Sequence, residues 1–349
     1  MHARPSPAEP AGNPPVGIAC HAAVEVRLSE LPRLRDLPVP AGAPALPPRF
    51  LRHADEQTVV GMRAVLEAIA AHPLPRPSFA RYGVVAATCR AGRFTAAQSL
   101  AMLRTGGGVT VTPHVVPQCA LHSLAGAVSV AFGMHGPNIG AGGGRHAVAE
   151  GLATAIALIS PGASAHAVVP GIWFVTTSWD DEPALDHSGR PNAAAAQAAP
   201  PDPLCRGLAV ALVAAGDTGA AGGAPPLQLA VHPAACGPDP SRPHDPSRPH
   251  HPSRPHHPSR PHGAVASARS TDHAAHDAAV GSVSGSIAAE AAPGADAFTA
   301  AADIRGLARA LVSAPPVAWS LRCPWGDEIR LESAAARAAS EPRGWREAA

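Results

Sequence analysis

The stretch from residue 110 to residue 182 constrains the fold most, because its apolar runs, glycines and turn residues follow one another in a single continuous order. It reads as a loop, an apolar helix over 120–134, a His-Gly-Pro-Asn turn, a glycine turn, a second helix over 145–159 and a strand over 171–177. Helical spacing that alternates with short β-branched runs is typical of α/β folds. The sequence therefore predicts an α/β domain built around this stretch.

The flanking segments continue the same pattern. Before the central stretch we expect a strand over 16–26, a helix over 47–72, a strand over 81–92, and a helix over 94–104 that ends at three glycines. The segment 110–119 is expected to be an extended loop, because it contains Pro113 and Pro117. After the central stretch we expect a hairpin of 204–213 with 226–232, a helix over 297–313, and a final hairpin of 317–321 with 328–331.

The order of elements resembles the centre of a β-ketoacyl synthase of the thiolase-like superfamily. The resemblance rests on four features: Leu121-His122-Ser123 with Ala125-Gly126 in the first helix, the Gly136-Pro137-Asn138 turn, the glycine turn from Gly142 to His146, and the strand 172–175 with the acidic Glu182 after it. It covers roughly residues 16–212 and implies a thiolase-like layered α/β fold whose second half is reduced. The segment with Arg49, Arg52 and Asp55 also fits that family's approach to its first long helix, although a solvated helix face explains each of these residues singly.

The family's nucleophilic cysteine is missing. Where the family carries Ala-Cys-Ser or Ala-Cys-Thr, this chain reads Gly143, Gly144, Arg145 and His146, following Gly142. None of these side chains forms a thioester, and no segment matches the family's two catalytic histidines. The resemblance therefore implies a degenerate nucleophile turn, no catalytic residue, and a protein similar to a chain length factor.

The glycine turn also allows a second interpretation, because glycines ahead of a helix can bind a phosphate through backbone N–H groups. A dinucleotide fingerprint needs a strand immediately before the glycines, and the preceding run has helical length instead. We expect that the glycines serve tight packing and that no cofactor binds. Arg145 or His146 could occupy the vacated pocket, but exposure on the helix face explains both more simply.

The six cysteines are scattered with no CxxC pair, which predicts reduced, mostly buried thiols and no metal site. Cys119 lies close to a histidine and is the one candidate for a relocated nucleophile. An acyltransferase or condensing enzyme that uses Cys119 or another thiol therefore stands as the alternative function.

Charge and hydropathy exclude several partners. The net charge is +1, which provides no basic surface for nucleic acid. No apolar run is long enough to span a membrane, and the proline-rich N-terminus lacks the apolar segment of a secretory signal. We expect a cytoplasmic protein.

A short repeat interrupts the second half. The unit Pro-Ser-Arg-Pro-His recurs over 239–263, and so short a proline-rich period cannot bury a face. The expected organisation is a disordered N-terminus (1–15), a ketosynthase-like domain (16–236), a low-complexity insertion (237–295), a helix and hairpin that complete the domain (296–335), and a tail (336–349). The repeated histidines could bind Ni, Cu or Zn weakly, or the repeat could have expanded without a function.

The resemblance implies a partner as well. A ketosynthase-like chain without its chemistry would stabilise or shape an intact ketosynthase in a fatty-acid or polyketide-type pathway, as a heterodimer that also contacts an acyl carrier protein. The apolar run 124–134 and the strand 171–177 are the stretches expected nearest to the interface.

Deletion of residues 239–263 should leave the melting temperature nearly unchanged, because a long surface loop costs little and a shorter one closes slightly more easily. Calorimetry of the full chain and the deletion variant measures this. A large loss of stability, or one that depends on added metal, would show that the repeat belongs to the fold.

Overall fold

A computed structural model describes residues 15–72, 76–159, 169–183, 185–192, 202–214, 227–233, 293–313 and 318–333. The histidine repeat, the tail 336–349, and nearly all of the expected N-terminal segment and insertion lie outside these described residues.

The described residues form a single mixed sheet with strand order β3-β2-β4-β5-β1-β6-β8-β7. Strands β2, β3 and β4 are parallel, β5 runs antiparallel to β4 and β1, and β8 runs antiparallel to β6 and β7. The bounds are β1 (Val16–Arg27), β2 (Gly83–Thr88), β3 (Asn138–Gly140), β4 (Gly171–Trp179), β5 (Leu204–Ala214), β6 (Leu227–His232), β7 (Trp319–Arg322) and β8 (Glu328–Ser333).

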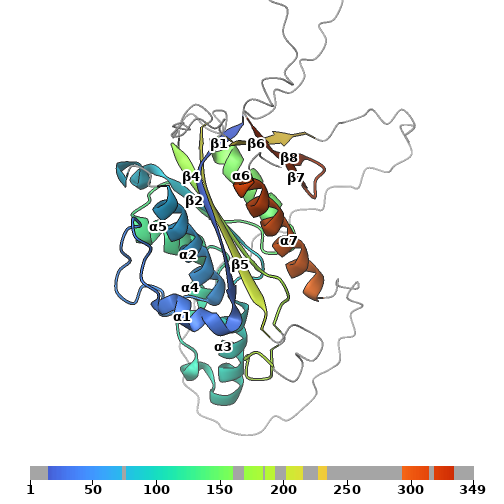
Figure 1. Ribbon diagram of the computed structural model, residues 1–349. Helices are drawn as coiled ribbons and strands as arrows, with labels where there is room; N and C mark the ends of the chain where they lie inside the picture. The colour runs from blue at the N-terminus through green and yellow to red at the C-terminus, as the bar shows by residue number, and fades with distance from the viewer. Residues whose placement is uncertain are drawn as a thin grey trace, which may run out of the picture. The chain divides into compact units, whose positions relative to one another are not determined.

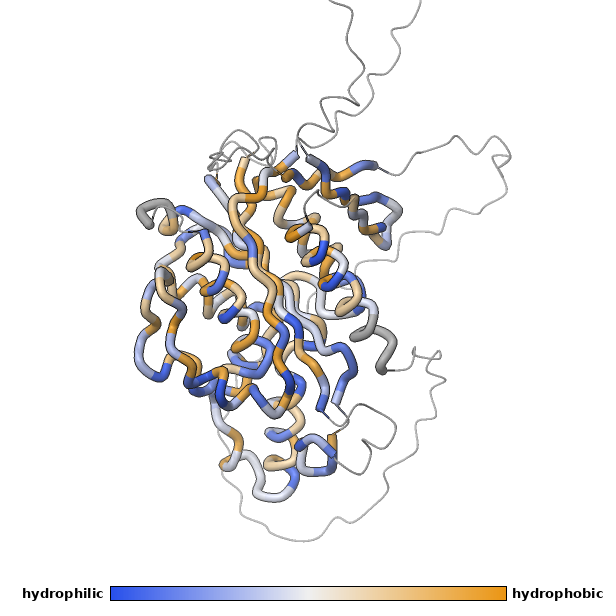
Figure 2. Tube along the Cα trace, in the orientation of Figure 1, coloured by the Kyte–Doolittle hydropathy of each residue, from blue (hydrophilic) through white to orange (hydrophobic). Residues whose placement is uncertain are grey.

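Helices cover both faces of this sheet, which confirms the predicted α/β class (Figure 1). Helices α2 and α5 pack on one face and α6 and α7 on the other. The hydropathy colouring shows apolar strands between these two layers (Figure 2). The helices are α1 (Leu31–Asp36), α2 (Glu56–Ala71), α3 (Arg93–Gly106), α4 (Val115–Cys119), α5 (Ser123–Phe132), α6 (Ala147–Ile159) and α7 (Pro293–Val312).

Strand β4 lies in the interior of the sheet and is buried along its whole length. Its side chains alternate between the two cores: Trp173 packs with Met62 and Leu124 on the α2/α5 side, and Phe174 packs with Leu152 on the α6/α7 side. A strand covered on both faces needs continuous apolar residues rather than alternation, which explains the run Ile-Trp-Phe-Val. The expectation that this strand lies near a partner surface is therefore wrong.

The predicted helix over 47–72 begins nine residues later than expected, at Glu56. The helix begins there because the carboxylate of Asp55 accepts hydrogen bonds from the backbone N–H groups of Gln57 and Thr58, at 3.0 and 3.1 Å. An aspartate in this position satisfies the free amides of the first helical turn. Asp55 is therefore a helix cap, and residues 47–54 form turns and extended chain.

The hairpin predicted for 204–213 with 226–232 is also wrong. Strand β6 pairs with β8 and with the start of β1, while β5 pairs with β4 and β1. Both edges of β5 are already occupied by longer partners, so β6 extends the sheet elsewhere. The final hairpin is confirmed, with β7 and β8 turning at Gly326.

Three short elements were not predicted: α1, α4 and β3. Helix α4 replaces part of the loop expected over 110–119, and β3 follows the His-Gly-Pro-Asn turn. Elements of three to six residues carry too few apolar positions to show a period. No helix among the described residues is both long and apolar enough to cross a bilayer.

The close approach of α6 to the sheet depends on Gly151. A Cβ atom there would lie 2.5 Å from the Cβ of Ala87 and 2.7 Å from Cε2 of Phe174. Gly126, inside α5, meets nothing within 4 Å and is a matched control.

Gly151→Ala should therefore lower the free energy of unfolding by about 1–3 kcal/mol, because overpacking outweighs the gain in helix propensity. Gly126→Ala should raise it by up to about 1 kcal/mol, since only propensity changes. Urea denaturation of both variants checks this. Equal effects of the two substitutions would show that α6 does not contact β2 and β4 as described.

Candidate functional site

The carboxyl ends of β2, β3 and β4 lie at one edge of the sheet, because the three strands are parallel. Ligands of open α/β sheets bind outside this edge. Three segments follow the strands here: 89–92 after β2, 141–146 after β3, and 180–183 after β4. We refer to these segments together as the carboxyl edge.

The glycine turn is held against this edge by two backbone hydrogen bonds. The N–H of Ala141 donates to the carbonyl of Ala86 at 2.8 Å, and the N–H of Arg90 donates to the carbonyl of Gly143 at 2.9 Å. Gly142 has a φ of 76°, and a Cβ on it would lie 2.6 Å from the Cα of Ala147. Packing and backbone conformation alone therefore account for this glycine.

Residues 142–146, for which the resemblance predicts a degenerate nucleophile turn, lead directly into α6. Arg145 and Gly144 are exposed, and Nε of Arg145 donates a hydrogen bond to Nε2 of His146 at 2.9 Å. His146 is therefore an acceptor in this pair. A cation at a helix N-terminus opposes the helix dipole, so Arg145 does not stabilise α6 through its charge.

The glycine turn follows a strand, contrary to the expectation from the sequence. A three-residue strand, β3, does precede the glycines, and α6 then leads to β4 in the same sheet. The order strand, glycine turn, helix and strand is thus present. β3 has three residues and is the outermost strand of the sheet. The sequence did not predict it, because the apolar run before the glycines was interpreted as one long helix.

Glu182 is buried beside two arginines. Its side chain is 5% exposed and pairs with the guanidinium of Arg93 at the start of α3. Burial raises the pKa of the Glu182 carboxyl, while the charges of Arg93 and Arg90 act in the opposite direction. Within the described residues, Oε1 of Glu182 is buried without a hydrogen-bond partner. The carboxylate therefore ties the end of β4 to α3, and a substrate could not reach it without a movement of the chain.

A buried amide joins the strand ends. Nε2 of Gln57, in α2, donates to the carbonyl of Cys89 at 2.9 Å and to that of Arg90 at 3.2 Å. Its Oε1 accepts a hydrogen bond from the Thr177 hydroxyl at 3.1 Å. Gln57 thus fixes β2 and β4 side by side at the carboxyl edge. Gln57, Arg90 and Arg93 were not predicted as site residues, because a polar residue in the first turn of a helix and arginines at a turn and a helix start have no distinctive spacing.

Cys119 is the last residue of α4. Its Sγ donates to the carbonyl of Gly92 at 3.4 Å. Burial raises the pKa of the Cys119 thiol, and the charges of Asp55 and Glu56 add to the effect. A nucleophilic cysteine needs a lowered pKa, so this environment disfavours the relocated nucleophile.

The other described cysteines are Cys20, Cys89, Cys205 and Cys323, and all four are buried free thiols. Cys236 lies outside the described residues. Within the described ranges, no group of three or more His, Cys, Asp or Glu residues is arranged to hold a metal ion.

No protein-family model and no curated protein sequence matches the chain. Solved structures that resemble it include the ishigamide ketosynthase/chain length factor, with 18% identity, a TM-score of 0.39, and coverage of 62% of this chain and 65% of that one. A ketosynthase in complex with its chain length factor from Xenorhabdus doucetiae has 15% identity, a TM-score of 0.39, and coverage of 62% and 83%. A β-ketoacyl synthase from Burkholderia phymatum has 14% identity, a TM-score of 0.37, and coverage of 58% and 59%.

These structures belong to the group of proteins that the sequence resembles. The similarity is too weak to assign the chain to a family, and the matched region is less than two thirds of the ishigamide protein.

Cys119 should react slowly with iodoacetamide at pH 8, because a raised pKa leaves little thiolate. Mass spectrometry of a Cys236→Ser variant, with Cys119→Ser added as the control, follows the labelling. Labelling faster than that of glutathione, with a midpoint below pH 8, would restore Cys119 as a candidate nucleophile.

Proposed function

We propose that the chain is a non-catalytic ketosynthase-like protein that acts as the partner of an intact ketosynthase in fatty-acid or polyketide-type biosynthesis. One observation carries the proposal: the turn from Gly142 to His146 keeps a tight backbone geometry ahead of a buried helix, yet presents no thiol. The backbone of this turn is suited to hold a nucleophilic thiol, but no cysteine is present there.

Condensation chemistry explains why this matters. A ketosynthase transfers an acyl group to a thiolate that a helix N-terminus makes more reactive. Here the two side chains at that N-terminus, Arg145 and His146, are hydrogen-bonded to each other. Neither can carry an acyl group as a thioester, and the buried Glu182 is already paired with Arg93. These paired side chains at the carboxyl edge therefore favour a structural role for this chain over a catalytic one.

The alternative, an acyltransferase or condensing enzyme with a relocated nucleophile, has less support. The pKa of the Cys119 thiol is raised rather than lowered, and the other described thiols are buried. A buried thiol with a raised pKa is chemically inert.

The edge of the sheet at β3 offers a surface for a partner. β3 is the outermost strand there, so one of its sides is unpaired among the described residues, and such an edge can pair with another chain. Helix α5 contacts β3, and its Val130 is 72% exposed. Of the two stretches expected near an interface, the apolar run 124–134 therefore remains, although Leu124, Val128 and Met134 point into the core.

We favour a heterodimer over a homodimer, because a pair of two inactive copies would catalyse nothing. The acyl groups would then be carried by the intact ketosynthase. The acyl carrier protein that delivers them would contact the pair.

Co-expression with an intact ketosynthase from the same genome should give one peak in size-exclusion chromatography that contains both proteins. Val130→Asp should weaken the association at least about tenfold, because a charge would be buried in the contact. Val312→Asp is the matched control, since Val312 on α7 is also 72% exposed. Separate elution of the two proteins, with this chain a stable monomer, would contradict the proposal.

A further inference from the structure

A cavity of about 610 Å³ lies between α1 and the chain that leads to α2. This volume falls in the range of small-molecule sites, roughly 300–1,000 Å³. Its lining shares no residue with the carboxyl edge and comes entirely from residues 32–52. The proposed partner function therefore does not explain this cavity.

Apolar side chains form much of its wall. Val39, Leu46, Phe50 and Leu51 line the cavity and also pack against the core cluster beneath α2 and α5. The cavity thus has an apolar floor that is continuous with the hydrophobic core. Such a floor suits an alkyl chain better than a polar metabolite.

The charged groups of the wall are three guanidinium groups and one carboxylate, from Arg35, Arg49, Arg52 and Asp36. The exposed side chains of Arg49 and Arg52 have no hydrogen-bond or ion-pair partner among the described residues. Two free guanidinium groups beside an apolar floor form a positive rim that outweighs the single carboxylate. Guanidinium groups bind carboxylate and phosphate oxygens through paired hydrogen bonds.

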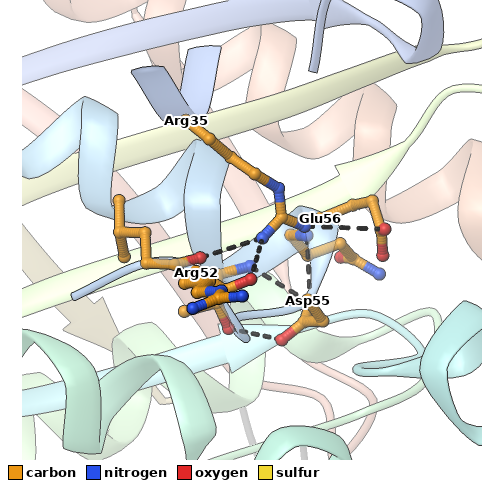
Figure 3. Close-up of polar contacts among 7 residues, drawn as sticks. Arg35, Arg52, Asp55 and Glu56 are labelled. Atoms are coloured by element: carbon orange, nitrogen blue, oxygen red, sulfur yellow. Dashed lines mark hydrogen bonds and ion pairs between the residues drawn. The ribbon is translucent and has the colours of Figure 1, made fainter. Parts of the chain in front are cut away.

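Arg35 holds the rim in place. From α1 it reaches the carbonyl of Leu51 at 2.9 Å and that of Arg52 at 3.5 Å, and it pairs with Glu56 at 3.7 Å (Figure 3). These contacts fix the turn that carries the other two arginines. Arg35 is thus a positioning residue, and its own charge is partly neutralised.

Arg49 adopts an unusual backbone conformation. Its φ is 61°, in the left-handed region that side chains other than glycine rarely occupy. Glycine would fit this turn with less strain, so stability alone does not explain an arginine here. Strained residues of this kind often mark ligand sites.

We infer that this cavity binds an amphiphile with an anionic oxygen head, in which the alkyl tail lies on Val39, Leu46 and Phe50 and the head contacts Arg49 and Arg52. A fatty carboxylate and an alkyl phosphate share this chemistry. The relative affinities of a fatty carboxylate and an alkyl phosphate show which of these two ligand classes the cavity prefers.

Calorimetric titration of the full chain tests the inference with dodecanoate and dodecyl phosphate, each below its critical micelle concentration, and with uncharged dodecanol below its solubility limit. At least one anion should bind about tenfold or more tightly than dodecanol, in line with one charge-assisted hydrogen bond. The advantage should shrink at high salt.

Variants separate the head contact from folding. Arg49→Gly and Arg52→Gln should each lower the affinity for the anion about tenfold, while Arg49→Gly leaves the melting temperature unchanged or raises it. Asp36→Asn should tighten binding, because it removes the one negative charge of the wall. Arg33→Gln is the control, since Arg33 is exposed on α1, the helix that carries Asp36, and does not line the cavity.

Equal binding of dodecanol and the anions, full affinity in Arg49→Gly, or no binding of any of the three compounds would each overturn the inference.

Discussion

Burial of β4 on both faces is the constraint on which the rest of the structure depends. The strand pairs with β2 on one side and β5 on the other, and Trp173 and Phe174 are both 0% exposed. Two helix layers are needed to cover it, and α6 comes close enough only because position 151 is a glycine. The same packing brings the strand ends together at the carboxyl edge, so the core fixes the geometry of the site.

Long elements with a clear period were predictable from the sequence. The strands β1, β2, β4 and β5 and the helices α3, α5, α6 and α7 all lie where apolar periodicity placed them, with small shifts at their ends. The start of α2 was misplaced because the apolar spacing continues upstream of Asp55, and only the cap contact reveals the boundary. The pairing of the strands was harder to predict than their positions along the chain. β6 has no local signal that favours β1 and β8 over β5, because that choice depends on which edges other strands leave open.

The candidate site was predictable in part. The glycine turn and Glu182 were recognised from the sequence, and the structure places both at the carboxyl edge. The residues that hold the edge together, Gln57 with Thr177 and Arg93 with Glu182, are far apart in the chain and make sense only once the fold brings them together. The same holds for the arginine-lined cavity. Arg49 and Arg52 read singly as solvated side chains, and only their common position on the rim suggests a ligand.

The proposal that this chain supports chemistry carried by another protein is tested most directly by intact-mass spectrometry of the co-purified pair. The pair would be incubated with acyl and malonyl carrier protein and each chain weighed separately. The account predicts an acyl adduct on the ketosynthase and none on this chain, because the turn from Gly142 to His146 offers no thiol. An acyl adduct on this chain would contradict it, and the modified residue would then identify the nucleophile.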